Sequence, residues 1–129
     1  MYKAIVKESS IELNAVEKVR AKNLTDALHI EELVNSADFE GETLPVIEPK
    51  AYQIISVEND KVEPPKYEVL VIEDVNGTRY QTGSNAFKNA FFEIWDELKD
   101  EKGWGIKCFG MDSKNYKGKK FLTCSVVTL

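Results

Sequence analysis

Residues 103–124 have the sequence GWGIKCFGMDSKNYKGKKFLTC, in which two apolar segments flank a basic loop centred on Tyr116. A hairpin that turns at Tyr116 places Cys108 opposite Cys124, because both are equally far from the tyrosine. Side chains alternate between the faces of a strand, so this register divides them into two sets. The set expected in the core is Ile106, Cys108, Leu122, Cys124 and Val126. The other set is predicted to form either a second buried layer or a platform for base stacking: Lys107, Phe109, Met111, Phe121, Thr123 and Ser125.

Positive charge is concentrated in the same part of the chain. Residues 102–129 contain six lysines and one acidic residue, a balance of +5, whereas the whole chain carries −5. The first 101 residues therefore carry −10. Lysines that follow phosphates and rings that stack on bases of any identity are typical of proteins that bind unpaired nucleic acid. The negative total argues against binding duplex DNA through bulk electrostatics.

Length and composition predict one domain over residues 1–129, and they exclude several classes of protein. We expect no membrane span and no signal peptide, because no apolar run is long enough, so a cytoplasmic location is predicted. His29 is the only histidine, which excludes a histidine triad or a multi-histidine metal site within one chain. The acidic residues at 93–101 are interpreted as a solubilising helix face rather than a metal site. We therefore expect no cofactor and no metal, and we assign no catalytic step, while metal-free carboxylate or thiol chemistry stays open.

Upstream, the pattern predicts three strands and a helix. A strand over 51–57, begun near 45–47, precedes a hairpin of 67–72 and 78–82 around Asn76-Gly77, a pair that favours a type I′ turn. That turn places Arg79 opposite Asp74 as a surface pair. Apolar residues at three- and four-residue steps predict a helix over 85–99, with Ser84 as its N-cap.

This order matches an oligonucleotide-binding (OB) fold, a five-stranded barrel with a helix between strands 3 and 4. We therefore predict a mainly β protein with an OB-like barrel core over 46–129. Residues 1–45 are predicted to be an N-terminal extension with an edge strand at Tyr2, Ala4 and Val6 and a short helix near 25–35. Trp104, between two glycines, is interpreted as a cap on the end of the barrel.

The C-terminal two thirds also resemble a known family. Asn76-Gly77-Thr78-Arg79-Tyr80, the following helix, Lys107, Ser113-Lys114 and Gly118 ahead of Phe121 are similar to single-stranded-DNA-binding replication proteins of small protein-primed tailed bacteriophages. The resemblance covers roughly residues 50–129. It implies a non-enzymatic protein that coats displaced strands during phage DNA replication, in the host bacterial cytoplasm. The family's DNA contacts fall on Tyr80, Lys107, Lys114 and Tyr116.

Sequence-independent binding of single-stranded DNA during phage replication or recombination is thus the predicted function. Replication or recombination proteins are candidate further partners, and the oligomeric state, monomer or homodimer, stays open. Two rivals are an interaction module that inhibits or recruits a host factor through an acidic N-terminal surface, and a metal-dependent nuclease. The predicted nucleic-acid-binding residues are Tyr80, Lys107, Phe109, Lys114, Tyr116, Lys117, Lys119, Lys120 and Phe121.

Overall fold

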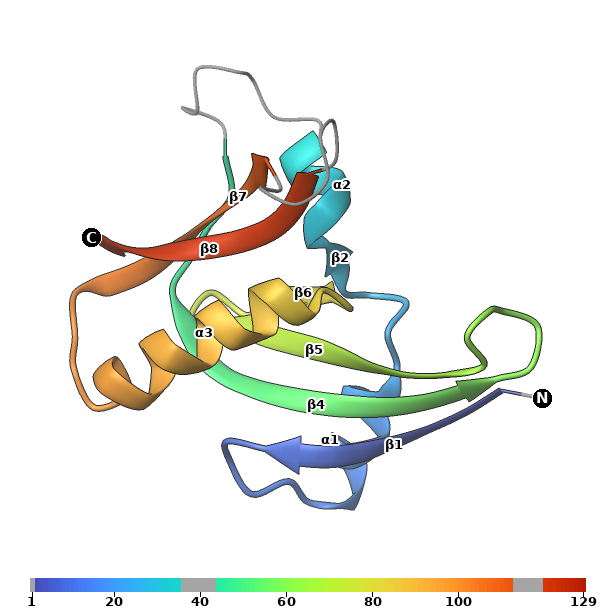
Figure 1. Ribbon diagram of the computed structural model, residues 1–129. Helices are drawn as coiled ribbons and strands as arrows, with labels where there is room; N and C mark the ends of the chain where they lie inside the picture. Colours follow the sequence, from blue (N-terminus) through green and yellow to red (C-terminus); the bar gives the residue numbers. More distant parts are fainter. Residues whose placement is uncertain (1, 36–43, 113–119) are drawn as a thin grey trace. The chain divides into compact units, whose positions relative to one another are not determined.

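The computed structural model describes residues 2–35, 44–112 and 120–129, and this part of the chain is mainly β (Figure 1). Its strands form two sheets, with the orders β1-β4-β5-β6-β2 and β3-β7-β8. The elements are β1 (Tyr2–Ser9), α1 (Ala15–Lys22), β2 (Leu28–His29), α2 (Ile30–Asn35), β3 (Val46–Ile47), β4 (Pro49–Asn59), β5 (Lys66–Asp74), β6 (Arg79–Thr82), α3 (Asn85–Leu98), β7 (Trp104–Asp112) and β8 (Lys120–Thr128).

The closed five-stranded barrel expected from the sequence is absent from the described residues. β7 and β8 pair with β3 in a sheet of their own, so they do not continue the sheet of β4, β5 and β6. The described chain also divides into two compact units, each built from two stretches. The first unit comprises Met1–Leu28 and Pro49–Gly83, and the second comprises His29–Glu48 and Ser84–Leu129.

The N-terminal residues belong to the first unit's sheet. The predicted edge strand is confirmed as β1, which pairs antiparallel with β4 from Tyr2 opposite Asn59 to Ser9 opposite Gln53. The helix predicted near 25–35 differs from the structure, where α2 occupies Ile30–Asn35 and the residues before it form a turn and β2.

Helix α1 covers one face of this sheet. Its Ala21 packs into a buried cluster with aliphatic residues of β4 and β5: Ile55, Val57, Val69 and Val71. A capping box begins the helix, because the Glu17 N–H donates to Asn14 Oδ1 (2.8 Å) and the Asn14 N–H donates to Glu17 Oε1 (3.1 Å). The opposite face of the sheet also carries buried residues: Ile54, Leu70, Ile72 and Thr82.

The hairpin between β5 and β6 has a register one residue away from the prediction. Gly77 has a positive φ of 92°, and Asn76 does not, so the type I′ turn is excluded. The Asp74 N–H donates to the Thr78 carbonyl (2.8 Å), which closes a three-residue loop instead of a two-residue loop. Arg79 therefore lies opposite Glu73, not Asp74, and Tyr80 lies opposite Ile72. A shift of one residue moves each side chain to the other face of the sheet.

This shift explains why Arg79 is buried, not part of a surface pair. Its side chain lies on the α1 face of the sheet and is only 5% exposed. The guanidinium donates to the carbonyls of Ala21 (2.8 Å) and Asn23 (2.9 Å) at the end of α1, and it pairs with Asp26. Carbonyls at a helix C-terminus lack intrahelical donors, and the Arg79 guanidinium supplies N–H donors to two of them.

In the second unit, the predicted helix is confirmed as α3, with the Ser84 hydroxyl accepting from the Phe87 N–H (3.2 Å). Its aromatic stripe is structural. Phe91 is fully buried and stacks on Trp95, with ring centroids 5.8 Å apart, and Trp95 meets Trp104 edge to face at 6.5 Å. Trp104 thus packs against the helix.

Candidate nucleic-acid interface

Strands β7 and β8 have the register predicted from the sequence. Cys108 lies opposite Cys124, and the pairing continues from Trp104 opposite Thr128 to Asp112 opposite Lys120. The hairpin is therefore symmetric about position 116, although residues 113–119 lie outside the described part of the chain. This symmetry places the two predicted sets of side chains on opposite faces.

The predicted core face is confirmed for four of its five residues. Ile106, Cys108, Leu122 and Cys124 are all buried. Val126 differs, with 49% exposed, because it lies close to the end of β8. The Ser84 hydroxyl, immediately before α3, donates to the Leu122 carbonyl (3.3 Å), which ties the start of the helix to β8.

The opposite face of β7 and β8, which we call the outer face, is open over much of its area. Lys107 and Phe109 are half-buried, whereas Met111 is 47% and Phe121 is 38% exposed. Thr123, opposite Phe109, is buried among these larger neighbours. The outer face therefore is not a second core layer throughout, and it presents two phenylalanine rings with one cation.

One predicted site residue lies in the other unit, and several others are not described. Tyr80 is a half-buried residue of β6 in the first unit, whereas Lys107, Phe109 and Phe121 lie together on the outer face in the second. Lys120 begins β8, but its side chain is outside the described part. The remaining predicted residues fall outside the described residues altogether: Lys114, Tyr116, Lys117 and Lys119.

Val46 on β3 extends the outer face, and sequence reasoning did not include it. It lies opposite Lys107, so both side chains belong to the same face, and it is 45% exposed. Its two-residue strand is too short to show an alternating pattern. The signal available was the run Pro45-Val46-Ile47, which we expected to begin the next strand instead of pairing with β7.

A close backbone approach fixes β3 beside β7. A Cβ atom at Gly105 would lie 2.8 Å from the Ile47 carbonyl oxygen, nearer than real Cβ atoms approach. Only glycine allows this spacing, so Gly105 sets how closely the third strand adjoins the outer face.

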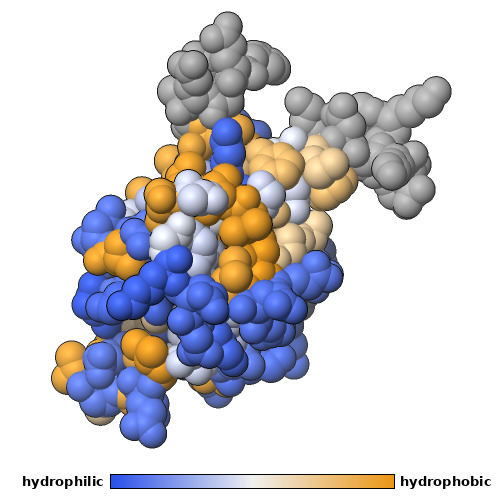
Figure 2. Space-filling view, turned by 90° about the vertical axis from the view of Figure 1, so that its left-hand side faces the viewer, coloured by the Kyte–Doolittle hydropathy of each residue, from blue (hydrophilic) through white to orange (hydrophobic). Residues whose placement is uncertain are grey.

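Exposed apolar side chains alone do not define a site. On the side of the molecule shown in Figure 2, hydrophobic side chains (orange) reach the surface at several places between hydrophilic ones (blue). Isolated apolar residues at a surface are normal in folded proteins. What distinguishes the outer face is that two rings and a cation share one face of one hairpin, next to the lysine-rich connection.

Burial raises the pKa of both cysteine thiols. Desolvation is the main cause for each thiol, and it raises the pKa of Cys124 to about 12. Proximity to Cys124 raises the pKa of Cys108 further. Both are free thiols in the interior of the hairpin. Thiols that stay protonated at neutral pH are poor nucleophiles, so the two residues act as small apolar core groups.

The free energy of unfolding is expected to fall as the pH rises above 9.0, the ordinary pKa of these thiols. The unfolded chain releases the thiol protons at lower pH than the folded chain, so each increase in pH toward about 12 favours unfolding. Urea unfolding at pH values on both sides of 9.0 would measure this. The Cys108→Ala/Cys124→Ala variant should be less stable at neutral pH and lose part of the alkaline fall. An equal alkaline fall in the variant would contradict the assignment.

Among the described residues, no group of three or more histidine, cysteine, aspartate or glutamate side chains is arranged to hold a metal ion. No helix in the described ranges has the length and apolar character needed to cross a membrane. Comparisons of the chain with protein-family models, curated proteins and solved structures found no match.

Proposed function

We propose that the chain binds single-stranded DNA without sequence preference, through the outer face of β7 and β8. The observation that carries this proposal is the placement of Phe109, Phe121 and Lys107 on one partly open face. Rings on a sheet face provide stacking surfaces for successive bases, and neighbouring cations neutralise phosphates. The connection between the strands, residues 113–119, adds three lysines in sequence and Tyr116, and Lys120 follows at the start of β8.

Single strands fit this surface better than duplex. A base can stack on a protein ring only when its own face is free, and bases within a duplex already stack on one another. The chain's net charge of −5 also opposes a broad electrostatic footprint, so attraction must be local. An open sheet face and one loop are sufficient for this mode, which therefore does not depend on a closed OB barrel.

The biological role follows from the resemblance of residues 50–129 to phage replication proteins. We place the activity in phage DNA replication or recombination, in the host cytoplasm, with proteins of those processes as further partners. No chemical step is assigned to the chain. Tyr80, in the first unit, is a further proposed DNA contact.

The test is a fluorescence-anisotropy titration with labelled oligo-dT and with duplex of equal length. Affinity for oligo-dT should exceed that for duplex. If three or four lysines contact phosphates, the logarithm of the affinity should fall against the logarithm of salt with a slope of roughly −2 to −3. A flat salt response, or equal affinity for duplex, would overturn the proposal.

The rings are tested by Phe109→Leu and Phe121→Leu, which keep an apolar side chain but remove the stacking surface. Each should weaken binding by about 1–3 kcal/mol if one base stacks on that ring. Tyr2→Leu is the matched control, because Tyr2 is 56% exposed in the first unit. If the control weakens binding as much, the outer face is not the site. In the same assay, Lys107→Gln should lose more affinity at low salt than at high salt.

A further inference from the structure

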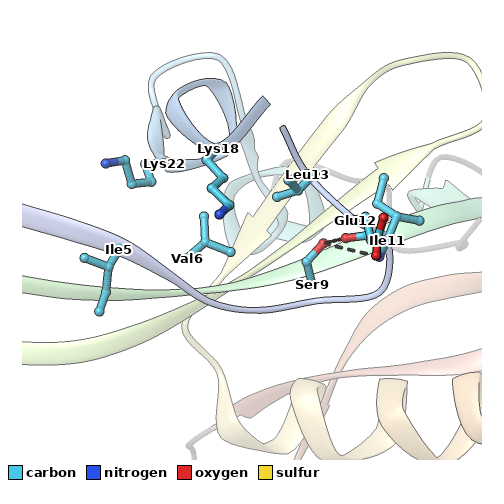
Figure 3. A pocket seen from close by; sticks show the side chains of 8 residues that line it. All are labelled: Ile5, Val6, Ser9, Ile11, Glu12, Leu13, Lys18 and Lys22. Carbon is cyan, nitrogen blue, oxygen red and sulfur yellow. Dashed lines mark hydrogen bonds between the residues drawn. The ribbon is translucent and has the colours of Figure 1, made fainter. Parts of the chain in front are cut away.

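A groove in the first unit runs beside β1, and its lining shares no residue with the proposed DNA site (Figure 3). Its volume is about 610 Å³, within the range typical of binding sites. The lining combines aliphatic side chains with a serine, a glutamate and two lysines. The lining residues are Ile5, Val6, Ser9, Ile11, Glu12, Leu13, Lys18 and Lys22.

The groove follows the edge of the sheet. Val6 points toward Leu13 and Lys18 on the α1 side, whereas Ile5 lies on the other side of β1 (Figure 3). β1 is the outermost strand of its sheet, with β4 on its inner side. The outer backbone groups of such a strand are a template for another strand. Because the register shifts between Val6 and Glu8, regular pairing is available only along residues 2–6.

The charged side chains that line the groove are two lysines and Glu12, so the lining has a net positive charge, and this charge selects the occupant. Lys18 and Lys22 lie one helical turn apart on α1, and neither has an ion-pair partner in the described part of the chain. Residues 2–22 contain five cations and three acids, a balance of +2 in a chain of −5. A strand with acidic side chains toward α1 and apolar side chains toward Ile5 would pair with the lysines on one side of β1 and cover Ile5 on the other.

We propose that β1 accepts an acidic, apolar peptide strand of a partner protein by strand addition along residues 2–6. Main-chain hydrogen bonds to β1 supply affinity, and alternate side chains of the peptide supply specificity. Carboxylates contact Lys18 and Lys22, and aliphatic side chains cover Ile5, which is 50% exposed. This surface is independent of the outer face of β7 and β8.

A second copy of the chain fits this edge less well. An antiparallel pair of β1 strands along residues 2–6 is centred on Ala4, so the second copy presents Tyr2, Ala4 and Val6 on the α1 side. None of these side chains is a carboxylate, so a second copy supplies no partner for Lys18 and Lys22. An acidic strand supplies one.

The probe is a labelled seven-residue peptide that alternates glutamate and valine, compared with one that alternates lysine and valine. Wild-type protein should bind the glutamate peptide at least tenfold more tightly than the lysine peptide. Lys18→Glu/Lys22→Glu should lower the affinity for the glutamate peptide at least tenfold and raise the affinity for the lysine peptide. Lys61→Glu/Lys99→Glu, with the same charge change at exposed lysines outside the groove, should alter both by less than twofold. Equal effects of the two double variants would overturn the proposal.

Hydrogen exchange distinguishes strand addition from binding through charge alone, and sedimentation distinguishes it from self-association. Hydrogen exchange over residues 2–6 should slow when the glutamate peptide binds, and binding without this protection would overturn strand addition. Lys18→Gln/Lys22→Gln should also lower the affinity for the glutamate peptide, so the test does not depend on whether the charge-reversed variant folds. Thermal unfolding shows whether both variants are folded. Sedimentation should show a complex of one chain with one peptide. A dimer that the peptide dissociates would instead identify a second copy as the occupant.

Discussion

Arg79→Met is expected to lower the free energy of unfolding by about 2–4 kcal/mol, because it leaves the carbonyls of Ala21 and Asn23 without their donor in a buried position. Methionine keeps most of the apolar volume of the arginine stem, so the loss reports hydrogen bonds more than packing. Gln81 performs a similar task beside it, donating to the carbonyls of Leu24 (2.8 Å) and Ala27 (2.9 Å). Urea unfolding followed by circular dichroism would measure the change.

Asp26→Asn is the control that separates hydrogen bonding from charge pairing. The Asp26 side chain is 52% exposed, and ion pairs of exposed carboxylates contribute under about 1 kcal/mol. We therefore expect Asp26→Asn to cost much less than Arg79→Met. If the two variants lose equal stability, the ion pair, not the end of α1, is the reason that Arg79 is buried.

Phe91→Ala should cost more, about 3–5 kcal/mol, because a fully buried ring leaves a cavity that its neighbours only partly fill. It also removes the ring stacked on Trp95. Phe92→Ala is a matched control, since it deletes the same group from the next position of α3, where the ring is only half-buried. A cost at Phe92 equal to that at Phe91 would contradict the packing described for this helix.

The positions of the tryptophans make these variants more informative. The chain has two tryptophans, Trp95 and Trp104, and both lie in the second unit. Tryptophan fluorescence therefore follows unfolding of the second unit, whereas circular dichroism follows both units. If Arg79→Met shifts the circular dichroism transition without moving the fluorescence transition, the two units unfold separately. Coincident transitions in both variants indicate one cooperative unit.

Local patterns predicted the elements of the C-terminal half well. The spacing of Cys108 and Cys124 about Tyr116 is sufficient to set the register of β7 and β8, because both strands belong to one hairpin. Periodicity and a serine N-cap likewise predicted α3. Three of the nine predicted site residues follow directly, since the face that carries Lys107, Phe109 and Phe121 is fixed by that register.

Where the predicted fold differed from the structure, the structure is decided by one loop residue or by contacts between residues that are distant in sequence. Asn76-Gly77 indicated the hairpin but not its loop length, and one extra loop residue moved Arg79 to the buried face. Helix α1 was missed because its short segment has few apolar residues and buries only Ala21, whereas its two valines, Val16 and Val19, are 78% and 66% exposed. The capping pair Asn14 and Glu17 was the available signal. The division into two sheets depends on pairings that no local pattern encodes.

The pairing of β1 with β4 has a consequence for synthesis of the chain. Tyr2 finds its place opposite Asn59, and Ser9 opposite Gln53, so β1 leaves the ribosome long before its neighbour exists. Contacts this far apart in sequence form slowly, because the intervening loop must close first. During that interval the nascent β1 has two unpaired edges instead of one, and pairing with a strand of another chain is its characteristic hazard. Lysines at positions 3 and 7 oppose such pairing between nascent copies by placing like charges on neighbouring strands.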